Sequence, residues 1–182
     1  MRILVQAARL YSILLVIGLF WIYSQRRFTW NLFFQITEER FSSVFLMTLG
    51  TASLLILLSL FVSQNFSWAQ HLENEFSKVL VPLQLWEIVA IAFLSGLVEE
   101  IFFRGAVQPA LGLIPASLLF GLAHLIPRNN FWPWSVYAAF GGFLLGCLFE
   151  LTRSLLPVIA AHSITNFTLI LILNLRHSDQ NT

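Results

Sequence analysis

The chain alternates between long apolar runs and short polar segments. Residues 41–62 carry no charge and match the roughly 20 residues that a helix needs to cross the hydrocarbon core of a bilayer. Further apolar runs predict additional membrane spans at residues 10–23, 83–109, 111–126, 131–149 and 155–175. The pattern therefore predicts an all-α fold, a polytopic membrane helical bundle of about six transmembrane helices.

The segments between these runs have patterns typical of the membrane surface. Residues 28–40 combine aromatic side chains with Glu38-Glu39-Arg40, which suits an interfacial connector. Over residues 68–80, apolar side chains recur at helical spacing while charged side chains occupy the other faces. This predicts an amphipathic helix that lies in the interface. Residues 128–134 are rich in tryptophan and predict an interfacial turn.

Composition favours one membrane domain over residues 1–182. With 58% hydrophobic and 10% charged residues, the chain is too apolar for a soluble domain. We expect a multi-pass integral membrane protein in contact with membrane lipid, located in the plasma (inner) membrane if the source is bacterial. The formal net charge of +1 gives no electrostatic footprint for nucleic acid. The single cysteine, Cys147, excludes an intrachain disulfide.

Three charged residues interrupt the apolar run at 83–109. A charge at the bilayer centre costs about 2.5 to 3.5 kcal/mol, so Glu99, Glu100 and Arg104 require a reason for being there. Glu100 and Arg104 are four residues apart and share one helix face in the favourable order. Glu99 points about 100° away. We expect Arg104 to hold Glu100 ionised, which leaves Glu99 to face a wet cavity as the candidate base.

Two other predicted spans contribute polar side chains at similar depth. His124 lies near the end of the apolar run at 111–126, four residues after Phe120. The Phe120 ring can shield the imidazole from lipid. His162 and Asn166 present an imidazole and an amide on one face of the sixth. Buried polar groups usually face the bundle interior or a water-filled cavity, so one cavity would satisfy all of them.

A carboxylate, two imidazoles and an amide are the groups needed to hydrolyse an amide bond. Glu99 can take a proton from water while one histidine shares that water. Asn166 and the other histidine can donate hydrogen bonds to the developing oxyanion. The sequence therefore predicts a hydrolytic site with Glu99, His124, His162 and Asn166 as its catalytic residues.

These motifs, in this order on successive apolar helices, resemble the CPBP family of intramembrane proteases. The motifs are Glu99-Glu100-x-x-x-Arg104, Phe120-x-x-x-His124 and His162-x-x-x-Asn166. The family includes CaaX prenyl endopeptidases and the bacteriocin-processing and self-immunity (Abi-like) membrane proteins. The resemblance covers residues 83–175 as a protease-like core and leaves residues 1–64 outside it as two additional spans. It also implies that Glu100 and Arg104 are supporting residues.

The resemblance implies an intramembrane endopeptidase that cleaves a peptide or membrane-protein substrate. In that case Glu99 activates water together with His162, and His124 and Asn166 stabilise the oxyanion. Metal dependence stays open, because Glu99, His124 and His162 could instead supply the three ligands of a catalytic zinc. Glu99 would then no longer be a free base, and this ligand count favours water activation without a bound metal or other cofactor.

Two other functions stay open at this point. A non-catalytic immunity or scaffold protein of the same fold would retain the motifs without turnover. An ion-coupled transporter would also line a cavity with Glu, His and Asn side chains. The sequence, however, shows no pair of matching interrupted segments of the kind that marks inverted repeats.

Overall fold

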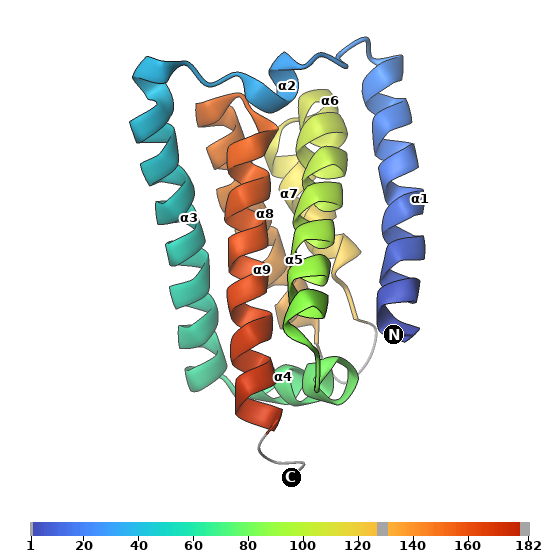
Figure 1. Cartoon of the computed structure of the whole chain (residues 1–182), viewed down its shortest axis with the longest axis vertical. Helices are drawn as coiled ribbons and strands as arrows, with labels where there is room; N and C mark the ends of the chain where they lie inside the picture. The colour runs from blue at the N-terminus through green and yellow to red at the C-terminus, as the bar shows by residue number, and fades with distance from the viewer. Residues whose placement is uncertain (1, 127–130, 179–182) are drawn as a thin grey trace.

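The protein is an all-α bundle whose long helices run side by side (Figure 1). The computed structural model describes residues 2–126 and 131–178, and within them it contains no strand. Four of its helices are long and apolar enough to cross a membrane. They are α1 (Arg2–Ser24), α3 (Glu38–Asn65), α8 (Trp132–Thr152) and α9 (Leu155–Ser178). The predicted fold class, a membrane helical bundle, is confirmed.

The third predicted span is a continuous helical segment with an unusual middle. It consists of α5 (Leu85–Glu100), a π-helical stretch η1 (Ile101–Val107) and α6 (Gln108–Leu111). Helix α5 begins at Leu85, where Gln84 and Glu87 form a capping box. The π-helical stretch widens the helix directly after Glu100.

The predicted number of about six spans is not confirmed. Helix α7 (Leu113–Ala123) has 11 residues, so it is too short to cross a bilayer alone. The segment Leu85–Leu111 qualifies as a span only together with α4, at a bend of 117°. The described residues therefore contain four candidate spans, or five if this bent pair is one span. The charges of Glu99, Glu100 and Arg104 lower the hydropathy of Leu85–Leu111, which is why this segment does not qualify as a span by itself.

Two short helices lie at opposite ends of the bundle. Helix α2 (Asn31–Phe34) is part of the connector between α1 and α3, and α4 (Ser67–Leu80) crosses the opposite end, near both termini (Figure 1). Helix α4 buries Ala69 and Leu72 on one face, in agreement with the amphipathic pattern. Of the predicted turn at 128–134, residues 128–130 lie outside the described residues and Trp132 begins α8.

Glycines let the helices approach closely. A Cβ atom on Gly121 of α7 would lie 2.4 Å from the Ser135 carbonyl oxygen and 2.6 Å from the Ala139 Cβ, both on α8. A Cβ atom on Gly96 of α5 would lie 2.3 Å from the Ser163 Oγ on α9. Lipid tails are as apolar as the helices, so such close packing is what holds membrane helices together.

We predict that Gly121→Ala destabilises the bundle. The added methyl group would meet backbone of α8, which cannot yield as a flexible side chain can, and overpacking of this kind costs about 1 to 3 kcal/mol. Thermal unfolding in detergent should show a melting temperature several degrees below wild type. Gly50→Ala is the matched control, because a Cβ atom at Gly50 meets nothing within 4 Å. Equal melting temperatures for the two variants would contradict the α7–α8 packing.

Candidate active site

A buried ion pair lies at the centre of the bundle. The Arg104 Nη1 donates to the Glu100 Oε1 at 3.0 Å, and the two residues are 1% and 0% exposed. The other guanidinium nitrogen donates to the Gly142 carbonyl on α8 at 2.7 Å. The guanidinium carbon also lies 4.8 Å from the centre of the Phe120 ring on α7, within cation–π distance. The predicted Glu100–Arg104 pair is thus present, and it links η1 to both α7 and α8.

The same carboxylate holds a histidine of α9. The His162 Nδ1 lies 2.6 Å from the Glu100 Oε1, and His162 is 7% exposed. Because a carboxylate oxygen accepts, Nδ1 is the nitrogen that carries the proton. In the neutral imidazole, Nε2 then has the lone pair. His162 also lines the cavity described below, so Glu100 fixes both the ring and its tautomer.

The neighbouring carboxylate has a different environment. The Glu99 Oε1 accepts a hydrogen bond from the Tyr11 hydroxyl of α1 at 3.0 Å. The Oε2 lies 3.8 Å from the His124 Nε2 and accepts no hydrogen bond from any described residue. Glu99 lines the cavity, whereas Glu100 and Arg104 do not. The two adjacent glutamates therefore point in different directions, as the helical period indicates: Glu100 lies in the ion pair and Glu99 faces the cavity.

His124 and Asn166 complete the group. The His124 Nδ1 lies 2.8 Å from the Phe120 carbonyl oxygen, which can only accept, so the Nε2 that faces Glu99 has the lone pair when the ring is neutral. The His124 ring also stacks on the Phe120 ring at 4.5 Å. The Asn166 amide donates one N–H to the Ser95 Oγ at 2.8 Å.

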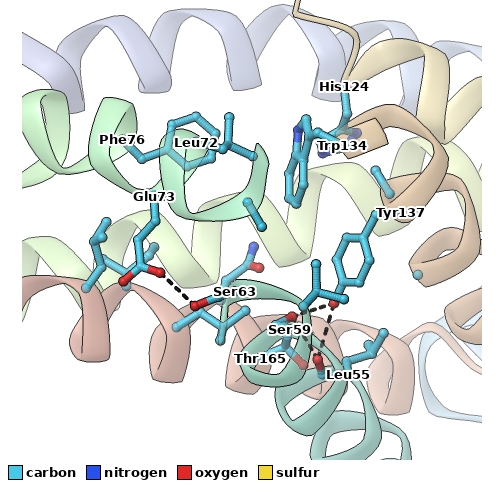
Figure 2. Close-up of a pocket in the computed structure, with 18 of the residues that line it drawn as sticks. Leu55, Ser59, Ser63, Leu72, Glu73, Phe76, His124, Trp134, Tyr137 and Thr165 are labelled. Atoms are coloured by element: carbon cyan, nitrogen blue, oxygen red, sulfur yellow. Dashed lines mark hydrogen bonds between the residues drawn. The ribbon is translucent and has the colours of Figure 1, made fainter. Parts of the chain in front are cut away.

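One cavity of about 430 Å³ joins these side chains. Glu99, His124, His162 and Asn166 all line it, so the structure brings the four predicted catalytic residues together. Figure 2 shows the cavity with His124, Trp134 and Tyr137 on one side, Leu72 and Phe76 of α4 on another, and the Ser63–Glu73 hydrogen bond at its far edge. Its volume is within the range typical of sites for small ligands and peptide side chains.

The described residues do not form a preassembled metal site. Within residues 2–126 and 131–178, no group of three or more His, Cys, Asp or Glu side chains is placed so that it could hold one. His162 uses its Nδ1 on Glu100, and the Glu99 Oε1 is occupied by Tyr11. These contacts use one atom of each residue and leave the His162 Nε2 and the Glu99 Oε2 without a hydrogen-bond partner among the described residues, so the ligand set Glu99, His124 and His162 keeps donor atoms but is not assembled around a common point.

One segment of the chain is similar to a known protein family. Residues 80–168 match the family described as type II CAAX prenyl endopeptidase Rce1-like. This segment, called the Rce1-like segment below, is similar to that family. All seven residues of the three motifs lie inside the Rce1-like segment, as do the close contacts that Gly96 and Gly121 allow.

The Rce1-like segment also has a curated relative. YpbD of Bacillus subtilis (strain 168), described as an uncharacterized protein, is 34% identical over 89 residues. The alignment covers 49% of this chain and 44% of YpbD, so it spans less than half the length of the relative. No solved structure matches the chain.

Sequence reasoning missed two members of the site. Tyr11 belongs to α1, which lies outside the Rce1-like segment. Its only sequence signal is a phenol in an apolar run, which needs a partner when it is buried. Ser95 is four residues before Glu99 on α5, a spacing that places it on the same helix face. Its hydroxyl fixes the amide of Asn166.

We predict that Arg104→Met strongly destabilises the protein. Without the guanidinium, Glu100 is left as a buried charge with only His162 beside it, and breaking a buried pair in this way costs about 3 to 5 kcal/mol. Arg153→Met is the matched control, since the Arg153 side chain is 64% exposed in its pair with Glu150 and such pairs contribute at most about 1 kcal/mol. Thermal unfolding of both variants in one detergent checks this, and similar losses would contradict it.

Proposed function

We propose that the protein is an intramembrane endopeptidase in which Glu99 and His162 activate water to cleave a peptide bond. The observation that carries this proposal is the meeting of Glu99, His124, His162 and Asn166 around one cavity of a membrane bundle. The match of residues 80–168 to a family named for CAAX prenyl endopeptidases supports the same reaction class. Four such groups on three helices would otherwise need separate structural explanations.

Water activation follows from the two carboxylates and their partners. The Glu99 Oε2 accepts one proton of a water molecule, and the His162 Nε2 accepts a hydrogen bond from the other. Glu100 keeps the His162 ring in the required tautomer through Nδ1. The water oxygen attacks the peptide carbonyl carbon, and the proton held on Glu99 then passes to the leaving amine. General base catalysis of this kind contributes about 100- to 10,000-fold in rate.

The oxyanion of the tetrahedral intermediate needs donors. Asn166 can supply an N–H, because its NH₂ group has two and the contact with Ser95 uses one. His124 can donate through Nε2 only when the ring is protonated, since its other nitrogen bonds Phe120. The loss of one such donor costs about 100- to 1,000-fold in kcat.

The substrate we propose is an apolar or lipid-modified peptide segment that reaches the site from the membrane. Most of the cavity lining consists of apolar side chains, such as Leu55, Leu72, Phe76 and Leu169. A prenylated CaaX tail and an unmodified leader or membrane-protein segment both have this chemistry. A quenched fluorogenic CaaX peptide, compared with and without a farnesyl group in nanodiscs, distinguishes them.

We predict that Glu99→Gln abolishes hydrolysis of these peptides and leaves the fold intact. The amide has nearly the shape of the carboxylate but cannot accept the proton, so the rate should fall at least about 100-fold. The melting temperature should stay within a few degrees of wild type. Glu39→Gln, at an exposed position of α3, is the control and should keep full activity. If Glu99→Gln cleaves as fast as wild type, the proposed chemistry is wrong and a non-catalytic scaffold is favoured.

We also predict that hydrolysis needs no metal ion. Protein purified without added ions should contain far less than one equivalent of zinc by elemental analysis, and it should keep its rate after dialysis against a chelator. One bound zinc per chain, lost together with activity on chelation and restored on readdition, would overturn this part of the proposal.

A further inference from the structure

Helix α1 supplies a side chain that touches the candidate base. We infer that Tyr11 is a positioning residue for Glu99, which holds one carboxylate oxygen so that the other faces the reacting water. This inference rests on the proposed function. Tyr11 lies 69 residues before the start of the Rce1-like segment, so it is a part of the site that this chain adds to the segment.

The position of Tyr11 is set by tight packing farther along α1. A Cβ atom on Gly18 would lie 3.3 Å from the Phe102 Cα, so the two backbones are nearly in contact. Ile22 is 0% exposed, and a Cβ atom on Gly105 would lie 2.8 Å from its Cδ1. Tyr11, Gly18 and Ile22 are spaced by seven and four residues and share one helix face. The face that packs on η1 therefore also carries the phenol to Glu99.

The hydrogen bond gives the two oxygens of Glu99 different tasks. The Tyr11 hydroxyl donates to Oε1 at 3.0 Å, and Oε2 lies toward His124 at 3.8 Å. A carboxylate can turn about its last torsion, which is broad and roughly two-fold, so nothing in the side chain itself fixes its plane. The donor from α1 fixes that plane. Without it Glu99 remains in the cavity but samples orientations in which no lone pair of Oε2 points at the water.

Tyrosine NMR tests the contact without any substrate. The chain has only three tyrosines, so labelling with ¹³C at Cζ gives three resonances that report on each phenol. Tyr23→Phe and Tyr137→Phe assign the third resonance to Tyr11 by elimination. We expect Glu99→Gln to shift the Tyr11 resonance, because a carboxylate acceptor is replaced by a neutral one, and to leave Tyr23 unchanged. Ser59→Ala is the control and should shift only Tyr137, whose hydroxyl contacts Ser59.

Kinetics test the role. With whichever of the two CaaX peptides wild type cleaves as substrate, Tyr11→Phe should lower kcat about ten-fold and change KM less than about two-fold. A ten-fold loss in kcat corresponds to the loss of about one hydrogen bond to a charged group. In the Glu99→Gln background, Tyr11→Phe should have no further effect, because it acts through that carboxylate. Tyr23→Phe, on the exposed side of α1 at 73%, should match wild type in kcat and KM.

The outcomes separate this inference from the proposed function. An unshifted Tyr11 resonance in Glu99→Gln overturns the inference whatever the activity. The inference is also overturned if Tyr11→Phe lowers kcat by the same factor in the Glu99→Gln background as in wild type. In that case Tyr11 only supports the packing of α1. If Glu99→Gln retains activity, the proposed function fails, while the NMR result still decides whether the contact exists.

Discussion

The ion pair between Glu100 and Arg104 is the constraint on which the rest of the structure depends. Neither charge is tolerable in the bilayer alone, and each is satisfied only because several helices meet around the pair. Arg104 reaches the Gly142 carbonyl on α8, and Glu100 reaches His162 on α9. A buried pair stabilises little by itself, but it forbids any packing that would leave one partner without the other. The pair therefore specifies one arrangement of α5, α8 and α9.

That arrangement gives the two neighbouring glutamates opposite properties. The Oε1 of Glu100 accepts hydrogen bonds from both Arg104 and His162, so Glu100 is paired with a cation and orients an imidazole. Glu99, about 100° farther round the helix, faces the cavity with one oxygen toward His124. The same backbone thus supplies one carboxylate that positions His162 and a second that lines the cavity.

Local spacing explains why much of the site was predictable. The Glu100–Arg104 contact and the separation of Glu99 from it are consequences of the helical period alone. The convergence of His124, His162 and Asn166 followed from the cost of burying polar groups rather than from any contact visible in sequence. Tyr11 was missed because a contact between residues 11 and 99 has no local signal. The predicted span count is not confirmed, because the charges of Leu85–Leu111 lower the hydropathy of that segment and because α7 is shorter than the apolar run that predicted it.

An experimental structure in lipid with a bound peptide phosphinate, a stable mimic of the tetrahedral intermediate, tests the central claim most directly. We expect the phosphinate to bind in the cavity between α5, α7 and α9, with one oxygen within hydrogen-bond distance of the Glu99 carboxyl and the other facing the Asn166 amide. A phosphinate bound elsewhere, or a Glu99 carboxyl turned to the acyl chains and remote from His124 and His162, would contradict it.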